Sequence, residues 1–168
     1  EMTSSLVGSE MCIRDRVNSY KRLVAGYEAP IYIAWSVMNR SPLVRVPAAR
    51  GEATRVELRC PDPACNPYLV LAVCLAAGLD GIKKKLVPPA RIDRNIFEMT
   101  RDEKEARHIE SLPQDLCEAT RELEKDAFVR NVLGEHVSEK YIEAKYKEWE
   151  NYRVQVTEWE IEEYLYRI

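Results

Sequence analysis

The chain has 168 residues, of which 46% are hydrophobic and 32% charged, and this balance excludes a disordered chain. The formal net charge of −3 excludes the strongly basic surface typical of nucleic-acid-binding proteins. The longest apolar stretch, residues 68–79, is too short for a membrane-spanning helix, which needs ~20 residues. Five cysteines without a C-x-x-C pair, and no secretory signal, predict a reduced, cytoplasmic protein.

Residues 1–16 have neither the helical nor the strand periodicity that the rest of the chain shows. They resemble a translated adapter sequence, and we interpret them as a non-native leader or sequencing artefact without information on the fold. The alternative is a genuine flexible N-terminus. Residues 17–30, with Gly26 and Pro30 around a polar tip, are expected to form a loop.

Short strands are predicted next. Residues 31–35 form an apolar run between turn signals, and residues 43–46 form a second run that Pro47 stops. Residues 55–60 alternate strictly between apolar and charged side chains. The apolar face contains Val56, Leu58 and Cys60, and the charged face contains Arg55, Glu57 and Arg59. Several short strands so close together predict an antiparallel sheet.

The remainder is predicted to be helical. Asn66 and Pro67 are typical of a helix start, and the helix over residues 68–84 is apolar enough to be deeply buried. A capping box of Thr100 and Glu103 predicts a short helix. Further helices are expected from residue 111 to about 126 and from about 138 to 164. The predicted fold class is therefore α+β, with antiparallel strands followed by helices.

Arginines are concentrated around the charged strand face, since Arg40, Arg45 and Arg50 come shortly before it. Guanidinium groups bind carboxylates and phosphates in a bidentate manner. A carboxylate held among arginines stays ionised and can ligate a hard metal ion. This pattern suits a nucleotide phosphate, a divalent ion and an acidic substrate in one cleft. The alternative is a solvated charge ladder on an exposed sheet face.

Four blocks of sequence, taken together and in order, resemble the glutamine synthetase family. They are NSYKRLV with GYEAP at 18–30, NRS with RVP at 39–47, RVELR with PDP and NPY at 55–68, and AGLDGIK at 77–83. The resemblance covers residues 17–168. It implies the C-terminal portion of the catalytic domain of a prokaryotic-type (type I) glutamine synthetase.

This resemblance implies ATP-dependent ligation of ammonia to L-glutamate through γ-glutamyl phosphate, which gives glutamine in nitrogen assimilation. Glu28 would lie on a flap that shields the acyl phosphate and would help to take a proton from ammonium. Arg22 and Arg59 would bind the substrate carboxylates. Arg40 would stabilise the transferring phosphoryl group.

The resemblance also implies a nucleotide and metal site. Arg40, Arg45 and Arg55 would bind ATP, and Glu57 would be a ligand of Mg²⁺ or Mn²⁺ on the ATP side. Since a Mg²⁺ site needs several oxygen ligands, we expect this chain to be inactive alone. The implied assembly is a homo-oligomer, a dodecamer of two stacked rings, with no nucleic-acid or membrane partner.

Two alternatives stay open. The first is a related γ-glutamyl-amine ligase that shares the fold and many of the arginines. The second is a truncated, non-catalytic paralogue that acts as an interaction module through its aromatic C-terminal tail.

Overall fold

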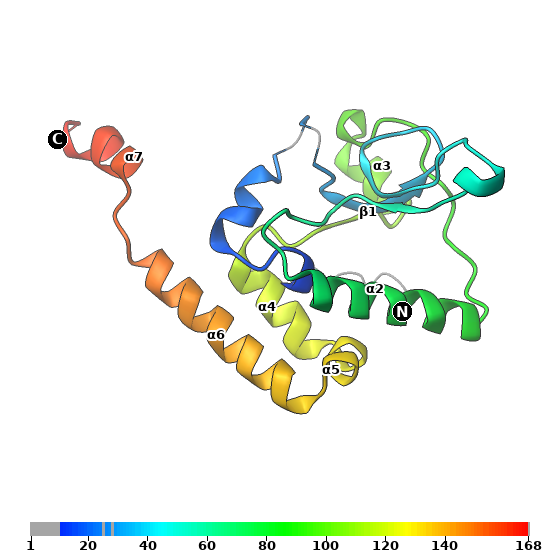
Figure 1. The fold of residues 1–168 in the computed structure, drawn as a ribbon. Helices are drawn as coiled ribbons and strands as arrows, with labels where there is room; N and C mark the ends of the chain where they lie inside the picture. Colours follow the sequence, from blue (N-terminus) through cyan, green and yellow to red (C-terminus); the bar gives the residue numbers. More distant parts are fainter. Residues whose placement is uncertain (1–10, 25, 28, 168) are drawn as a thin grey trace.

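The computed structural model describes residues 11–24, 26–27 and 29–167, and these residues form a small mixed sheet flanked by helices (Figure 1). The elements are η1 (Val17–Arg22), β1 (Tyr32–Ser36), β2 (Pro42–Arg45), η2 (Gly51–Ala53), β3 (Glu57–Leu58), α2 (Pro67–Lys83), η3 (Ile96–Glu98), α3 (Arg101–Ala106), β4 (Glu110–Ser111), α4 (Leu116–Lys125), α5 (Ala127–Leu133), α6 (Glu135–Arg153), α7 (Glu158–Glu160) and the π-helical turn η4 (Ile161–Leu165). The predicted α+β class is confirmed.

The sheet has the order β3-β2-β1-β4 and is not purely antiparallel. The pairs β2–β3 and β1–β4 are antiparallel, as predicted, but β1 and β2 run parallel. Residues 37–41 lead the chain from the end of β1 back to the start of β2. Ser36 Oγ accepts hydrogen bonds from the backbone N of Met38 and Asn39, and Asn39 Oδ1 accepts one from Ser41 N. These side-chain turns compact a connection that is normally much longer between parallel strands.

Helix α2 begins where the sequence predicts. The Asn66 side chain accepts hydrogen bonds from the backbone N of Tyr68 and Leu69, and Pro67 occupies the first turn, where its missing N–H costs nothing. The capping box of Thr100 and Glu103 at the start of α3 is also present.

Two helix predictions were wrong in their limits. Asp115, not a residue near 111, caps α4, because Glu110 and Ser111 pair with β1 instead. The last predicted helix is interrupted: α6 ends at Arg153, and α7 starts anew behind the capping box of Thr157. Figure 1 shows α7 and η4 standing away from the body after this break.

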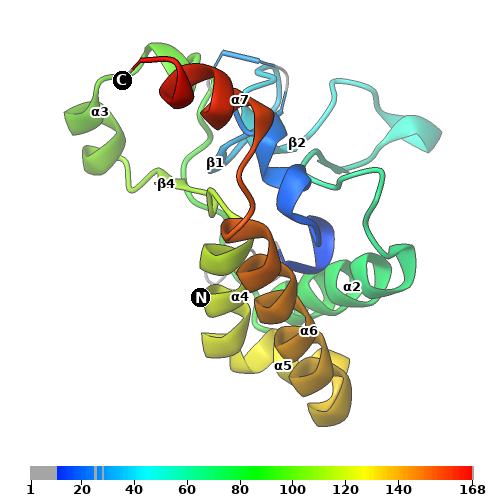
Figure 2. The same cartoon turned by 90° about the vertical axis from the view of Figure 1, so that its left-hand side faces the viewer.

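Helices α4, α5 and α6 pack together beside α2 and next to the sheet, as Figure 2 shows from the side. Their shared core is apolar and includes Val73, Leu116, Ala119, Leu123 and Val129. A second apolar cluster lies between the sheet and α2 and includes Ile33, Leu43, Cys60 and Leu112. The second cluster holds β2 and β3 against α2, since Leu43, Val44 and Leu58 pack in it together with Val70.

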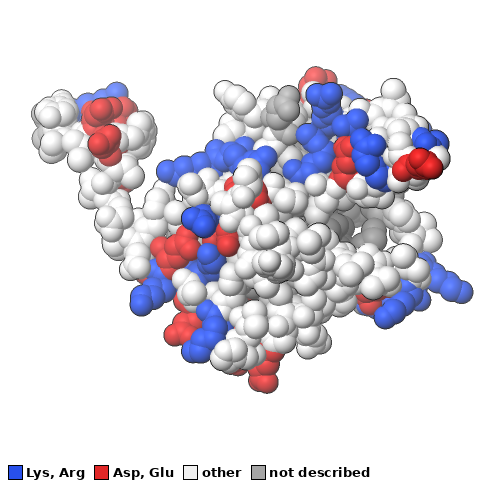
Figure 3. All heavy atoms as spheres, in the orientation of Figure 1, with Lys and Arg blue, Asp and Glu red and all other residues white. Residues whose placement is uncertain are grey.

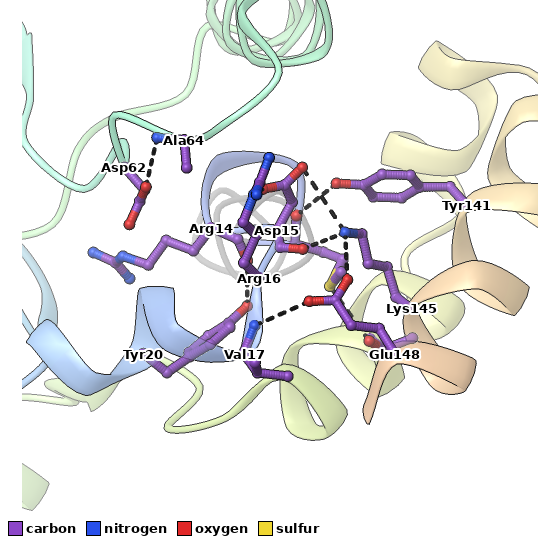
Figure 4. A network of polar contacts seen from close by, with 12 residues as sticks. Arg14, Asp15, Arg16, Val17, Tyr20, Asp62, Ala64, Tyr141, Lys145 and Glu148 are labelled. Carbon is purple, nitrogen blue, oxygen red and sulfur yellow. Dashed lines mark hydrogen bonds and ion pairs between the residues drawn. The ribbon is translucent and has the colours of Figure 1, made fainter. Parts of the chain in front are cut away.

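Residues 11–17 are tied to α6 by a polar network (Figure 4). Tyr141 Oη donates to Met11 O over 3.1 Å, and Lys145 donates to Asp15 O and contacts Glu148 Oε2 at 3.0 Å. Burial raises the pKa of Tyr141 far above its usual range, with neighbouring negative charge as a smaller cause. Met11, Cys12 and Ile13 are fully buried. In this structure Met11, Cys12 and Ile13, which belong to the predicted leader, therefore pack against the rest of the chain.

The predicted deep burial of the helix 68–84 was wrong for one half of it. Val73 is fully buried, but Tyr68, Leu71, Leu75, Leu79 and Ile82 are exposed. The chain itself contains no described element that covers this half.

Candidate nucleotide and substrate site

The charged face predicted for residues 55–59 forms at the edge of the sheet. In the β2–β3 register Arg45 lies opposite Glu57, and Val44 lies opposite Leu58. Directly opposite side chains in an antiparallel pair point to the same face, so strand pairing delivers Arg45 to the carboxylate of Glu57. The apolar partners on the other face, Val44 and Leu58, pack against the second core cluster.

Glu57 is held between two arginines. Arg55 Nη2 and Nε lie 2.7 and 3.0 Å from Glu57 Oε1, and Arg45 Nη1 lies 3.3 Å from Glu57 Oε2. The side chain of Glu57 is 28% exposed, and those of Arg45 and Arg55 are 30% and 52% exposed. The cluster is thus half-open to solvent and carries an excess of one positive charge. Such a site attracts an anion that can compete for the guanidinium groups.

Backbone carbonyls orient the arginines around this cluster. Arg55 Nη1 donates to Ala53 O over 3.3 Å, and Arg50 Nη1 donates to Pro47 O over 2.7 Å. Within the described part of the chain, the buried Nε atom of Arg45 has no hydrogen-bond partner. An unpaired buried donor is costly, so this atom favours an incoming acceptor such as a phosphate oxygen.

The predicted substrate-binding arginines come from two segments that meet near the end of β3. Arg59 is half-buried, and its backbone N bonds to Leu43 O over 2.9 Å, which continues the β2–β3 pairing. Arg22, at the end of η1, donates from Nη1 to Pro61 O over 3.2 Å. This bond holds the segment that leads into the predicted flap close to the end of β3.

Arg40 lies on the turn between β1 and β2 and is exposed. Among the described residues, no hydrogen bond or ion pair joins it to Arg45, Arg55 or Glu57. The role predicted for Arg40 stays a prediction.

The sequence did not reveal what holds the turn of Arg40 in place. Ser36 Oγ donates to Asp93 Oδ1 over 2.9 Å, and Asn39 Nδ2 donates to Arg94 O over 2.6 Å. These contacts join residues more than fifty positions apart. The only local indication of these contacts in the sequence is Ser36 at the end of an apolar run, and it is a weak one.

Glu28, the predicted flap residue, lies outside the described residues. The described residues also contain no group of three or more His, Cys, Asp or Glu side chains placed to hold a metal ion. Glu57 alone supplies one carboxylate, whereas Mg²⁺ prefers an octahedral set of oxygen ligands. The described residues therefore fit the phosphates of a nucleotide, and at most one position of a metal site.

Figure 3 shows how the charges are distributed on one face. Basic side chains gather around a small acidic patch over the part of the molecule where β2, η2 and β3 lie in Figure 1. No helix among the described residues is long and apolar enough to cross a membrane.

Comparison with known proteins places nearly the whole chain in one family. A family model described as the glutamine synthetase catalytic domain matches residues 4–164. The chain belongs to the glutamine synthetase family. The glutamine synthetase of Thermotoga maritima is 57% identical over 150 residues, which make up 89% of this chain and 34% of that protein. The glutamine synthetase of Methanocaldococcus jannaschii is 57% identical over 149 residues, 89% of this chain and 33% of that protein.

Solved structures of GmaS share the fold. The chain superposes on ligand-free GmaS with a TM-score of 0.78 and 38% identity, covering 98% of this chain and 37% of that one. For a GmaS complex with ADP the TM-score is 0.81 at 36% identity, with 98% and 38% covered. This glutamine synthetase chain thus spans about a third of the length of the curated relatives it matches.

The match to the family model begins inside residues 1–16. The interpretation of these residues as a non-native leader stays a prediction. Sequencing the source DNA upstream of the codon for Val17 tests it. If residues 1–16 are a leader, the source DNA should encode a sequence other than residues 1–16 before Val17.

Proposed function

We propose that the full-length protein to which this chain belongs ligates ammonia to L-glutamate at the expense of ATP, through γ-glutamyl phosphate. The observation that carries the proposal is the Arg45–Glu57–Arg55 cluster, two guanidinium groups fixed on one carboxylate at the sheet edge of a glutamine synthetase catalytic domain. Curated relatives named glutamine synthetase, at 54–57% identity, support it.

In this proposal the cluster binds the phosphates of ATP. Arg45 and Arg55 exchange part of their contact with Glu57 for phosphate oxygens, and the unpaired Nε of Arg45 provides an additional donor. The charge of both arginines then stabilises the negative charge that builds up during phosphoryl transfer. The ADP complex of the neighbour GmaS supports nucleotide binding by this fold.

Glu57, released from part of its arginine contacts, would supply one carboxylate ligand to a divalent ion, Mg²⁺ or Mn²⁺. The ion would offset charge on the phosphates when bound. Its other ligands would come from parts of the full-length protein outside this chain. Arg40 would assist at the transferring phosphoryl group, and Arg22 and Arg59 would hold the carboxylates of glutamate. Glu28 would close over the acyl phosphate.

We also propose that the protein is a cytoplasmic homo-oligomer. Cys12, Cys65 and Cys117 are free thiols, which suits a reducing compartment. The tail formed by α7 and η4 stands away from the body and exposes Trp159 and Tyr164, whose ring centroids lie 5.8 Å apart. Exposed aromatic side chains of this kind are typical of subunit interfaces.

A chimera tests the proposed reaction. In it, the aligned segment of the Thermotoga maritima glutamine synthetase is replaced by the matching segment of this chain. We expect it to form glutamine from glutamate, ammonia and ATP. Arg55→Ala should lower kcat/KM at least about 100-fold, because removal of a transition-state charge contact costs about 2.7–4 kcal/mol.

Arg101→Ala is the matched control. Arg101 also pairs with a glutamate, Glu105 at 2.8 Å, but on helix α3 and with a side chain that is 90% exposed. Its substitution should leave the rate unchanged. A folded chimera that consumes ATP only with another amine would favour the γ-glutamyl-amine ligase instead. A folded chimera without any ligase activity would contradict both readings.

A further inference from the structure

Helix α2 has a composition that is unusual for a surface helix. Over Pro67–Lys83 it contains only Asp80 and Lys83 as charged residues, both in its last turn, and the rest is apolar or small. An amphipathic surface helix has a polar side, whereas a helix that is apolar all round is normally buried on all sides.

One half of α2 packs on its own domain. Val73 is fully buried, and Leu69 packs against the same core cluster, while Val70 packs against the second cluster. Because successive residues rotate by about 100° around a helix, these side chains lie on one side of it.

The opposite half of α2 carries an apolar stripe, defined by Tyr68, Leu71, Leu75, Leu79 and Ile82. The spacing of three and four residues aligns them along one side, away from Val73. Tyr68 is 82% exposed, Leu71 68%, Leu75 66% and Ile82 75%. In Figure 3 the side of α2 that faces the viewer is uncharged along most of its length, with charged groups only towards its C-terminal end.

A stripe of this length is an interaction surface. A solvated helix face would contain charged residues between the apolar ones, and the stripe contains none. The chain spans only about a third of its curated relatives, so most of the polypeptide that could cover the stripe lies outside it.

We propose that the apolar stripe of α2 is an interior surface of the full-length protein, covered by the polypeptide that this chain lacks. The chemistry required of that partner is an uncharged, apolar face, and α2 becomes the joint between the part of the protein that this chain supplies and the remainder. The proposal concerns assembly and is independent of the ligase reaction proposed above.

Accessibility of a single cysteine tests the proposal. Leu75→Cys is prepared in the isolated chain and in the Thermotoga maritima chimera, and labelling of that residue by a bulky maleimide is followed by peptide mass analysis. We expect rapid labelling in the isolated chain and at least about 100-fold slower labelling in the chimera. Arg101→Cys, at a residue on α3 whose side chain is 90% exposed, is the matched control and should label equally in both.

Three outcomes are informative. Equal labelling of Leu75→Cys in both contexts would overturn the proposal. Protection in the isolated chain that rises with protein concentration, with no further protection in the chimera, would overturn it in favour of a second copy as the occupant. Should the chimera not assemble, the same substitution at the aligned position of the Thermotoga maritima protein gives the measurement, and free labelling there would refute the inference. No substrate is present, so failure of the ligase proposal would leave these rates unaffected.

Discussion

Replacing Glu57 by Gln is the perturbation that separates a phosphate site from a structural charge ladder. The cluster of Arg45, Arg55 and Glu57 holds two positive charges and one negative charge, a net charge of +1, and Glu57→Gln raises this to +2. In the isolated chain, without metal, the carboxylate competes with any incoming anion for both guanidinium groups. We therefore expect Glu57→Gln to bind inorganic tripolyphosphate more tightly than the wild type.

The expected gain in affinity for tripolyphosphate follows from the exposure of the two ion pairs. Their contacts of 2.7 and 3.3 Å are short, but the side chains are 28–52% exposed, and solvent reduces the strength of such pairs. Each pair contributes about 0.2–1 kcal/mol. The wild type must give up both pairs to bind the anion, at a total cost of about 1 kcal/mol, and Glu57→Gln lacks this cost, which corresponds to about fivefold tighter binding.

Isothermal titration with tripolyphosphate, at low salt and with and without Mg²⁺, measures this. Mg²⁺ should improve binding to the wild type more than binding to Glu57→Gln, because only the wild type offers a carboxylate ligand. Glu105→Gln is the control: it makes the same change in net charge at an ion pair on α3 and should change affinity less than about twofold. Weaker binding of Glu57→Gln without metal would refute competition between Glu57 and the anion.

Three further results are expected. Leu123→Ala should lower the free energy of unfolding in urea by about 2–5 kcal/mol, since Leu123 is fully buried, whereas Leu165→Ala, at a 60% exposed residue, should change it by less than about 0.5 kcal/mol. Burial, with the 2.9 Å hydrogen bond to Glu124, raises the pKa of Tyr146 to about 12. The stabilisation that Tyr146 contributes should therefore be complete below about pH 10 and lost as the pH rises through 12. Difference absorbance titration against Tyr146→Phe should show this phenol ionising near pH 12, and Glu124→Gln should lower its pKa. The isolated chain should show no glutamate-dependent ATP hydrolysis in a coupled assay, and a measurable rate would contradict the single-carboxylate account of its metal site.

Local features of the fold could be predicted because they depend on neighbouring residues. The cap of Asn66, the capping box of Thr100 and the strands β1 and β2 formed within one residue of the predicted limits, whereas β3 is confined to Glu57–Leu58 of the predicted run 55–60. The parallel pairing of β1 and β2 could not be predicted, because it depends on Ser36 and Asn39 side chains that shorten the connection, and on the distant Asp93 that holds Ser36.

The candidate site was predictable to a similar extent. Strict alternation was enough to place Arg55 and Glu57 on one face, and the strand register then added Arg45. Burial of α2 was mispredicted for a physical reason: an apolar composition does not reveal which sides of a helix its own chain covers, and one half of α2 is exposed among the described residues.

Transfer of an isotopic label tests most directly the claim that this chain completes a site where glutamate is phosphorylated. The Thermotoga maritima chimera is supplied with ATP, ammonia and glutamate that carries oxygen-18 in its γ-carboxylate. If phosphate is attached to that carboxylate and then displaced by ammonia, the inorganic phosphate released must contain one oxygen-18 atom for each glutamine formed. Unlabelled phosphate released together with glutamine would contradict a γ-glutamyl phosphate, and with it the role proposed for the Arg45–Glu57–Arg55 cluster.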